Sequence, residues 1–239
     1  MVFGMIQKKD IQEYDANIVS LAQVNMFKGQ LATNKISDER VIHALMSVDR
    51  SHYIPEHLHN NAYVDADVKL CNHRYLLAPL TFARMLVLAN VAPHHQVLDV
   101  GAGKGYSAAV LAHMAKHVVA IEENPELVAA ARKKLAQHHV RNVDIVTTPL
   151  AIGCSAHQPY DVIIAEGVLQ AIPTKYEKQL AEDGTIVALK AAAPMFATKQ
   201  VLAHIVVGKK RQDQVHYAEY ETKFAYPLYE TLAQDGFVF

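Results

Sequence analysis

One glycine-rich segment constrains the fold of this chain more than any other feature. It reads VLDVGAGKGY from Val97 to Tyr106 and joins a short apolar run to an apolar stretch with helical spacing. Glycines let the backbone turn sharply and let a ligand lie against it without meeting a Cβ atom. Open α/β sheets bind their ligands beyond the carboxyl ends of their strands, at junctions of this kind. The segment therefore predicts a strand, a ligand-binding loop and a helix in a mostly parallel sheet.

The sequence after residue 95 alternates between short apolar runs, typical of buried parallel strands, and helical patterns. The predicted strands are Gln96–Val100, His117–Glu122, Val143–Thr147, Tyr160–Glu166 and Gly184–Lys190, and the predicted helices are Tyr106–Ala115, Pro125–Gln137 and Pro173–Ala181, the last followed by Asp183-Gly184 as a helix stop. The pattern then changes. Two apolar stretches, Gln200–Gly208 and Gln214–Ala225, flank the polar turn Lys209–Asp213 and predict a hairpin, so that one strand runs antiparallel to the rest.

Residues 1–92 show helical periods and turns instead. Ser37 is predicted to cap a helix whose buried face carries Val41, Leu45 and Val48. A second helix is predicted from Pro79, where a missing N–H costs nothing, to near Asn90. We expect residues 1–92 to form a helical lid with a substrate loop and residues 93–239 to form the ligand-binding α/β domain, the two packing as one compact unit.

Two classes of ligand use a glycine loop of this kind. A dinucleotide fold requires G-x-G-x-x-G, with the pyrophosphate at the helix N-terminus. Here the third glycine comes one residue early, and Asp99 stands two residues before the first glycine. A carboxylate there suits the ammonium group of a methionine moiety better than it suits a pyrophosphate. The spacing favours S-adenosylmethionine, with a dinucleotide, or a tight turn whose glycines serve packing alone, as the alternatives.

Acidic residues at the ends of neighbouring strands extend this candidate site. Glu122 ends the second predicted strand, where its side chain can bind the ribose hydroxyls of either ligand class. Glu166 lies at the end of the fourth predicted strand and either contacts the cofactor or substrate or is an ordinary strand-end carboxylate.

The composition limits the partners and the compartment. The formal net charge is −1, so no overall field favours nucleic acid or an anionic membrane. No stretch approaches about 18 uninterrupted apolar residues, the start lacks a signal-peptide pattern, and two cysteines are too few for a disulfide framework. We therefore expect a cytoplasmic protein with no nucleic-acid or membrane partner. We also predict no metal site, because His113 and His117, four apart on a predicted helix, have no third ligand nearby.

Together with the sequence before it, the glycine segment resembles the protein-L-isoaspartate O-methyltransferase family. The N-terminal matches make the resemblance specific, because all class I methyltransferases share the glycine segment. The resemblance covers roughly residues 25–190. The matching text is Asn25-Met26, Gln30-Leu31, Ile36–Val41, Arg50–Pro55, Ala62–Asp65, Pro79, the glycine segment, Ile121-Glu122, Pro125–Leu127, Tyr160–Ile164 and Ile172-Pro173.

The resemblance implies an α/β, class I S-adenosylmethionine-dependent methyltransferase (Rossmann-like) fold, with a mostly parallel sheet, an antiparallel edge strand and a helical N-terminal lid. It implies methyl transfer to the α-carboxylate of isoaspartyl residues in damaged proteins, which starts their repair, so that a protein or peptide is the substrate. Methylating a carboxylate needs no strong base, because the nucleophile is already ionised near neutral pH. We therefore name no catalytic base.

The cofactor positions of the family can be placed on this chain. Asp99, Gly101, Gly103 and Glu122 fall on them directly. Where the family has an acidic residue near the adenine, this chain has Pro149, followed by Leu150, which can pack on the adenine ring. The full set of residues predicted to bind the cofactor is Asp99, Gly101, Ala102, Gly103, Gly105, Tyr106, Glu122, Glu123, Pro149, Leu150 and Glu166.

The predicted substrate loop departs from the family pattern. That pattern reads G-x-G-Q-T-I-S-x-P, whereas Cys71–Pro79 reads CNHRYLLAP. Leu77 replaces the serine, which is taken to meet the substrate, and Tyr75 replaces the threonine. Leu77 cannot donate a hydrogen bond, whereas Arg74 and Tyr75 can, and these three residues are the candidates for contact with the methyl acceptor. The departure predicts weak turnover of ordinary isoaspartyl peptides. The alternative function is an S-adenosylmethionine-binding protein of this fold with an altered substrate or without transferase activity.

Overall fold

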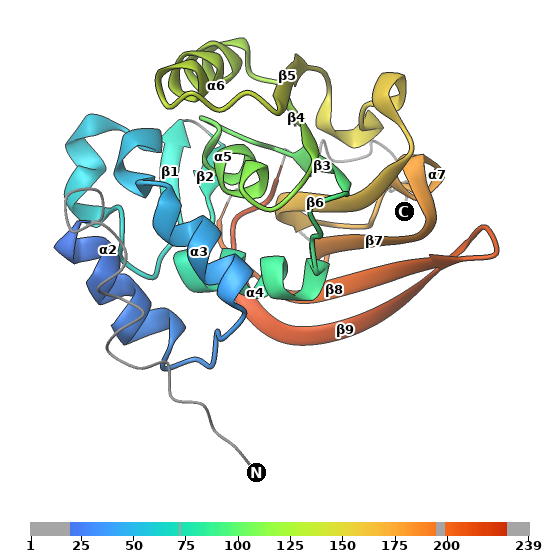
Figure 1. Ribbon diagram of the computed structural model, residues 1–239. Helices are drawn as coiled ribbons and strands as arrows, with labels where there is room; N and C mark the ends of the chain where they lie inside the picture. Colours follow the sequence, from blue (N-terminus) through green and yellow to red (C-terminus); the bar gives the residue numbers. More distant parts are fainter. Residues whose placement is uncertain (1–19, 72, 195–198, 229–239) are drawn as a thin grey trace, which may run out of the picture.

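The sheet predicted from the alternating pattern is present in the structure, a computed structural model that describes residues 20–71, 73–194 and 199–228. Among these residues, seven strands pair in the order β5-β4-β3-β6-β7-β8-β9 (Figure 1). The strands from β3 to β7 pair in parallel, and β8 and β9 pair antiparallel with their neighbours, as predicted. Their bounds are β3 (Gln96–Val100), β4 (His117–Glu122), β5 (Val143–Thr147), β6 (Tyr160–Leu169), β7 (Leu180–Ala191), β8 (Val201–Arg211) and β9 (Gln214–Ala225).

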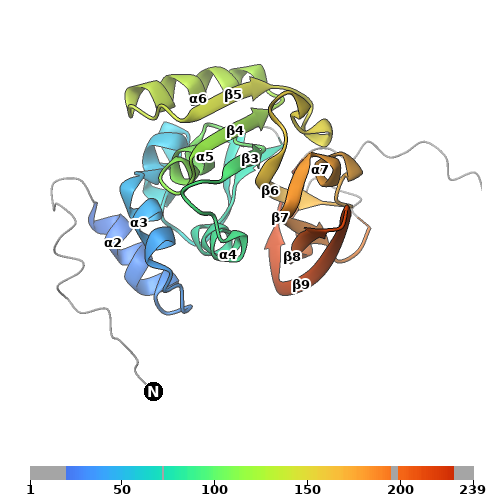
Figure 2. The same ribbon diagram turned by 45° about the vertical axis from the view of Figure 1, so that its right-hand side comes forward.

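Side chains that alternate along the central strands divide the core into two clusters. In β4, Val118 and Ala120 belong to the cluster on one face of the sheet, and Val119 and Ile121 belong to the cluster on the other. This division follows from the two-residue period of a strand. The first face is covered by α4 (Pro79–Ala89), α5 (Tyr106–Ala112) and α6 (Pro125–Gln137), and the second by α7 (Thr174–Gln179) and the short helix η4 (Leu150–Ile152) (Figure 2).

The chain order reverses at β3. From this strand, β4 and β5 follow on one side of the sheet, and β6 and β7 follow on the other. At such a switch point the connections leave toward opposite sides, and a crevice forms beyond the carboxyl ends of the strands. The glycine loop after β3 therefore faces the end of β6 across this crevice.

A layer of helices from the N-terminal part packs over α4 and α5. It contains α2 (Leu21–Met26), its π-helical continuation η1 (Phe27–Leu31), α3 (Glu39–Ser47) and the 3-10 helices η2 (Arg50–Tyr53) and η3 (Glu56–Asn61). The prediction that Ser37 caps α3 was wrong by one residue. Asp38 is the cap, because its carboxylate accepts the backbone N–H of Arg40 at 2.9 Å. Val41 and Leu45 are buried as predicted, and Val48 is buried just beyond the helix end.

A two-stranded hairpin occupies the segment that the sequence predicted as a loop. Its strands are β1 (Val68–Cys71) and β2 (Arg74–Leu76), which pair antiparallel, with Cys71 opposite Arg74. Asn72, between them, lies outside the described residues. Arg74 and Leu76 are buried while the residue between them is half-buried, so β2 turns one face into the protein. The hairpin leads into α4, whose predicted start at Pro79 and end near Asn90 are confirmed.

Several other element ends differ from the predicted ones. β7 begins at Leu180, directly after α7, so the predicted helix stop at Asp183-Gly184 lies within a strand, with φ of +63° at Asp183. β6 runs to Leu169 rather than ending at Glu166. β5 is half-exposed at the sheet edge, whereas it was predicted to be buried.

The sequence also predicted the positions of a histidine pair and of a polar turn incorrectly. α5 ends at Ala112, and His117 is the first residue of β4, so the histidines considered as a pair do not share a helix. The terminal hairpin turns at Gln212-Asp213, both with positive φ, and residues 209–211 belong to β8. Two-residue turns with positive φ match the twist of paired strands.

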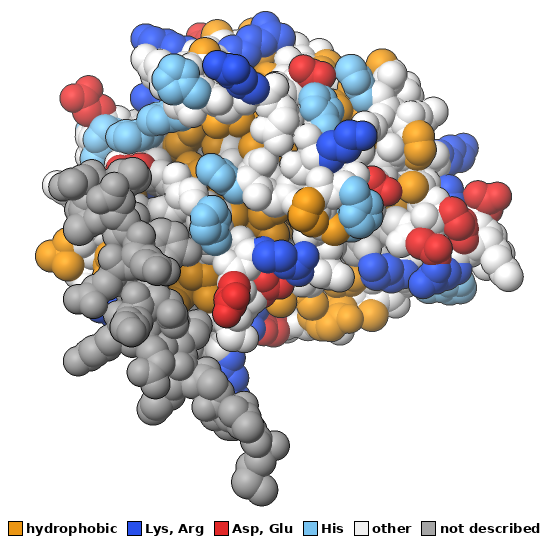
Figure 3. Space-filling view, in the orientation of Figure 1, with side chains coloured by type: hydrophobic (Ala, Val, Ile, Leu, Met, Phe, Trp, Pro, Cys, Tyr) orange, Lys and Arg blue, Asp and Glu red, His pale blue; other side chains and the backbone are white. Residues whose placement is uncertain are grey.

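The surface carries charges of both signs. On the face in Figure 3, basic and acidic side chains are interspersed over the helices and around the β8–β9 hairpin. In the described ranges, no helix is both long enough and apolar enough to cross a membrane. Residues 1–10, for which the sequence predicts no signal peptide, lie outside the described residues. The division of the chain after residue 92 stays a prediction.

Candidate active site

Three carboxylates meet at the carboxyl ends of three neighbouring strands. Asp99 lies in β3, Glu122 is the last residue of β4, and Glu166 lies in β6 just beyond the pairing of that strand with β3. All three side chains are buried. Parallel strands end at the same edge of a sheet, which is why residues far apart in sequence converge here.

The glycine loop turns directly after β3 and stays against β4. The N–H groups of Gly101 and Ala102 both donate to the carbonyl oxygen of Ile121, at 2.8 and 3.1 Å. Gly101 and Gly103 have φ values of +88° and +54°, in the left-handed region that residues with a Cβ rarely adopt. The loop ends at Gly105, the N-cap of α5. Its path therefore depends on glycine at the positions where the sequence has it.

Asp99 and Glu166 each keep one carboxylate oxygen, Oδ1 and Oε1, without a hydrogen-bond partner among the described residues. The other oxygen of Asp99 accepts from Ser107 Oγ at 2.7 Å. Burial, with a smaller contribution from the charge of Glu122, raises the pKa of Asp99 to about 7. Burial also raises the pKa of Glu166 well above its ordinary value, and the charge of Asp99 adds to that shift. A cationic group placed here would pair with acids that the chain leaves short of donors.

Glu122, in contrast, is fully bonded. Its Oε1 accepts the N–H groups of Glu123 and Asn124 at 3.0 and 3.1 Å, and its Oε2 accepts the N–H of Gly103 at 3.0 Å. Oε2 also accepts from the guanidinium of Arg74, from Nη2 at 3.0 Å and from Nε at 3.2 Å. The ion pair is buried, with side-chain exposures of 6% for Arg74 and 0% for Glu122.

Arg74 fills the space between β2 and the glycine loop. Besides its bonds to Glu122, Nη2 donates to the carbonyl oxygen of Gly101 at 2.6 Å, and Nη1 donates to that of Leu228 at 2.5 Å. A Cβ added to Gly101 would lie 2.6 Å from Nη2 and 2.5 Å from Leu228 Cδ1. The room that the glycine leaves is therefore taken up by side chains of the same protein.

The other predicted cofactor residues lie in different surroundings. Tyr106 packs in the N-terminal layer, with the guanidinium carbon of Arg50 5.0 Å from the centre of its ring. The carboxylate of Glu123 accepts the N–H of Leu150 at 3.3 Å, which ties the end of β4 to η4. Leu150 is fully buried in the second cluster, and Pro149 before it is exposed.

The two remaining substrate-loop candidates diverge from Arg74. Tyr75 is half-buried and stacks on Tyr226, with ring centroids 3.6 Å apart and ring planes 1° from parallel. Leu77 is 2% exposed and belongs to the first apolar cluster, while its carbonyl oxygen accepts from Arg50 Nη2 at 2.5 Å. The side chain of Leu77 thus contributes to the core between the helical layer and the sheet.

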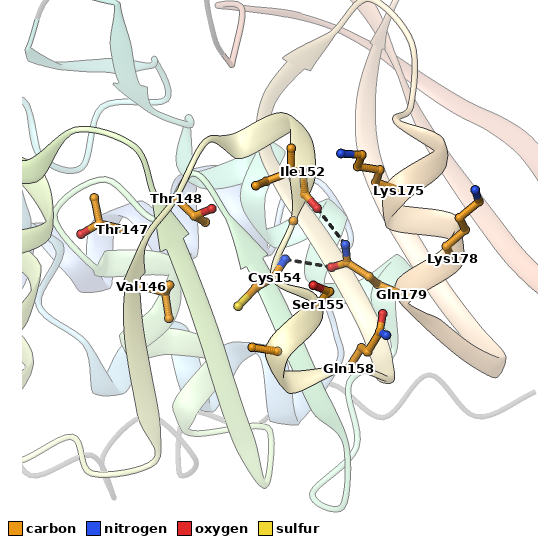
Figure 4. A pocket seen from close by; sticks show the side chains of 12 residues that line it. Val146, Thr147, Thr148, Ile152, Cys154, Ser155, Gln158, Lys175, Lys178 and Gln179 are labelled. Carbon is orange, nitrogen blue, oxygen red and sulfur yellow. Dashed lines mark hydrogen bonds between the residues drawn. The ribbon is translucent and has the colours of Figure 1, made fainter.

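A pocket of about 600 Å³ opens nearby, between the end of β5 and α7. Figure 4 shows it beside Thr148, Ile152 and Cys154, with Lys175 and Lys178 on the opposite wall. Gln179 closes its floor, since its amide donates to Ile152 O and accepts from Cys154 N, both at 2.8 Å. None of the predicted cofactor residues lines this pocket.

The family model of protein-L-isoaspartate(D-aspartate) O-methyltransferases matches residues 22–230. The chain belongs to this family. The match extends beyond residues 25–190, over which the sequence resemblance was recognised, to β8 and β9.

Individual relatives agree with the family assignment. A protein-L-isoaspartate O-methyltransferase of Protochlamydia amoebophila is 32% identical over 192 residues, which are 80% of this chain and 88% of that protein. Protein-L-isoaspartate O-methyltransferase 2 of Marinobacter nauticus is 36% identical over 162 residues, or 68% of this chain and 74% of that protein.

Solved structures of the family share the fold. One protein-L-isoaspartate O-methyltransferase superposes with a TM-score of 0.73 at 18% identity, over 86% of this chain and 65% of its own. A Plasmodium falciparum family structure, in complex with S-adenosyl-L-homocysteine, superposes with a TM-score of 0.71 at 20% identity, over 87% of this chain and 98% of its own. The predicted α/β class I methyltransferase fold is confirmed.

Three site residues were not found from the sequence. Ser107, which bonds Asp99, carries only the weak signal of a hydroxyl in the first turn of the helix after the loop. Tyr226 and Leu228 follow β9, outside the stretch over which the resemblance was recognised. They reach the cleft because Pro227 pairs with Val168 at the end of β6. This contact joins segments that are distant in sequence, so a local sequence pattern cannot predict it.

Proposed function

We propose that this chain is an S-adenosylmethionine-dependent O-methyltransferase that acts on a carboxylate of a protein or peptide. The observation that carries the proposal is the meeting of a glycine loop with three buried carboxylates at the switch point of the sheet. Membership in the family, whose Plasmodium falciparum structure contains S-adenosyl-L-homocysteine, supports the same class of cofactor.

The residues of the cleft fit this cofactor in kind. Glu122 would accept hydrogen bonds from the ribose hydroxyls, and Gly101 and Gly103 would let the ligand approach the backbone. Asp99 Oδ1 and Glu166 Oε1, which lack partners among the described residues, suit the ammonium group. A dinucleotide, the other class of ligand that uses a glycine loop, would bring its negatively charged pyrophosphate toward these buried acids, which is unfavourable.

The chemistry asks for positioning rather than for a base. When bound, the cofactor supplies a methyl group on a sulfonium, which a carboxylate oxygen takes up as the carbon–sulfur bond breaks, leaving a methyl ester and a neutral thioether. The residues of this chain then have to hold the acceptor in line and exclude water. The hairpin and the helical layer are placed to do so, and Tyr75 is our candidate for orienting the acceptor, because it carries a hydroxyl on the hairpin.

Protein repair and a cytoplasmic location belong to this proposal. Cys71 and Cys154 are both free thiols, as is usual for proteins of reducing compartments.

One observation favours a second candidate, a cofactor-binding protein without transferase activity. Leu77 stands where the family pattern has a serine, and its side chain is buried in the first apolar cluster. A desolvated carboxylate acceptor would find no hydroxyl at that position. Leaving a charged acceptor short of a donor typically costs about 1–3 kcal/mol or more.

Transfer of labelled methyl groups separates these possibilities. The protein is incubated with methyl-labelled S-adenosylmethionine and with an isoaspartyl peptide, its aspartyl twin or aged protein, and base-labile methyl ester is counted. We expect ester formation on at least one carboxylate acceptor and its loss in Glu122→Gln. Glu221→Gln, which neutralises an exposed acid on β9, is the control and is expected to retain activity. Binding of S-adenosylhomocysteine without any ester would favour the second candidate, and failure to bind it would refute both.

A further inference from the structure

The cleft that is proposed to take the cofactor is closed by the chain itself. Arg74 enters it from β2 and makes four hydrogen bonds of 2.5–3.2 Å there, two to Glu122 and one each to the carbonyl oxygens of Gly101 and Leu228. Charge-assisted bonds of this kind are roughly twice as strong as neutral ones. The guanidinium therefore occupies the carboxylate that a ribose would need.

The apolar side of the same space is also filled. Leu228 Cδ1 stands 2.5 Å from the position of a Cβ on Gly101, and Leu70 Cδ1 stands 2.6 Å from that of a Cβ on Gly103. The backbone of Leu228 lies against Gly167 in the same way, with its Cα 2.9 Å from a Cβ there. Leu228 is fully buried, so it is held in the cleft rather than resting at its entrance.

Arg74 and Leu228 are held by one continuous set of contacts, here called the clasp and made of residues 74–75 and 226–228. Tyr75 stacks on Tyr226, which joins the two segments. Val168 fixes the second segment to β6, because its N–H donates to Tyr226 O at 3.0 Å and its carbonyl accepts the N–H of Leu228 at 2.9 Å. Opening the cleft at Arg74 therefore disturbs the segment after β9 as well.

We propose that Arg74 competes with the cofactor for Glu122 and thereby determines the affinity of the cleft, the clasp being the closed state of the site. This inference rests on the proposed function, because it assumes that S-adenosylmethionine is the ligand. When the cofactor binds, its neutral ribose hydroxyls have to replace the charged guanidinium of Arg74 as donors to Glu122. The weaker bonds of the neutral donors leave the balance in favour of the closed state. A ligand that binds only the open state shows an apparent dissociation constant raised by the inverse of the open fraction.

Calorimetric titration with S-adenosylhomocysteine tests the competition. Arg74→Gln removes the guanidinium and introduces the residue that the family pattern has at this position. We expect it to bind at least about tenfold more tightly than the parent protein, as when an open fraction of about a tenth becomes the main state. The matched control is Arg84→Gln, because Arg84 pairs with Glu221 at the same 3.0 Å on the surface of α4 and β9. That variant is expected to bind like the parent.

A second variant and a second readout keep the test independent of the folding of Arg74→Gln. Tyr226→Ala removes only the ring that stacks on Tyr75 and is also expected to tighten binding. In the parent protein, S-adenosylhomocysteine should speed hydrogen exchange at the amides of Val168 and Leu228, whose bonds hold the clasp. Equal affinity of the parent, Arg74→Gln and Tyr226→Ala would overturn the competition and leave the proposed cofactor standing. No binding by any of the variants would overturn the proposed cofactor, and this inference with it.

Discussion

Replacing Glu122 by glutamine is expected to lower the free energy of unfolding by about 3–5 kcal/mol, the cost of leaving one member of a buried ion pair without its partner. The amide of glutamine has one accepting oxygen, which can serve either the guanidinium of Arg74 or the N–H groups of Glu123 and Asn124, and the other set loses its acceptor. Arg74 loses the opposite charge in either case, and its bonds to the carbonyl oxygens of Gly101 and Leu228 remain. Its side chain is 6% exposed, so water cannot replace what is lost. The melting temperature should fall by about 6–20 °C in a chain of this length.

Replacing the other member of the ion pair, Arg74, should lower the free energy of unfolding by less. In Arg74→Gln, the carboxylate of Glu122 keeps three backbone N–H donors, from Gly103, Glu123 and Asn124. We expect the free energy of unfolding to fall by about 1–3 kcal/mol, the cost of one buried group left short of a partner. The double variant, with both Arg74→Gln and Glu122→Gln, carries neither charge, so its loss of stability should be smaller than the sum of the two single losses by about 1–3 kcal/mol.

Urea unfolding of the four proteins in the ligand-free state gives this coupling energy. Arg84 and Glu221 supply the matched control cycle, since their side chains are 3.0 Å apart but 23% and 45% exposed. Their coupling is expected at about 0–1 kcal/mol, as for surface pairs. Additive losses at Arg74 and Glu122, within about 0.5 kcal/mol, would show that the pair is not formed in solution and would refute the reasoning.

Three further outcomes are expected. Asp99 has its pKa raised to about 7, so the folded state holds an extra proton between about pH 4 and pH 7, and the stabilisation present below pH 4 is lost as the pH rises through 7. Asp99→Asn should therefore gain stability relative to the parent from pH 5 to pH 8 in urea unfolding, and parallel curves would contradict this. Gly103→Val should abolish binding of S-adenosylhomocysteine in calorimetry, because the backbone at residue 103 has φ of +54° and an added Cβ would meet Leu70. Gly29→Ala is the control, since an added Cβ there has no atom within 4 Å, and it should bind normally. Methyl transfer to an ordinary isoaspartyl peptide should be weak, and Leu77→Ser should recover little of it while losing about 2–5 kcal/mol of stability; robust, isomer-selective turnover by the parent protein would show that Leu77 is no obstacle.

Much of the fold could be predicted because its signals are local. β3, β4, β5 and α6 have the bounds that the sequence predicts, since each is an apolar run or a capped helix with a clear start. Asn124 and Pro125 illustrate this, because a side-chain cap followed by proline fixes the first turn of α6 without help from the rest of the chain. The glycine loop is equally local, since Gly101 and Gly103 adopt positive φ without the strain that a Cβ would bring.

The errors arise where two local signals compete. Ser37 and Asp38 are both good N-caps, and the helix starts after the one whose carboxylate reaches two N–H groups. Asp183-Gly184 reads as a helix stop, yet the chain is already in β7 there, because pairing with β6 begins at Leu180. In the first case a local capping bond chooses between two adjacent candidates, and in the second a tertiary contact, the pairing with β6, overrides the local signal.

The closure of the cleft by Arg74 could not be predicted from local sequence patterns. The sequence places Glu122 at a strand end, as the structure does, but it places Arg74, 48 positions away, in a substrate loop where the structure has strand β2. What joins them is the direction of one side chain, which depends on the register of the β1–β2 hairpin. Cys71 pairs with Arg74 across a bulge, and a shift of one residue would turn Arg74 outward and Tyr75 inward. Tyr75 has no charge to offer Glu122, so the closed cleft follows from that register, and any change that slips the hairpin should open the site even with Arg74 intact.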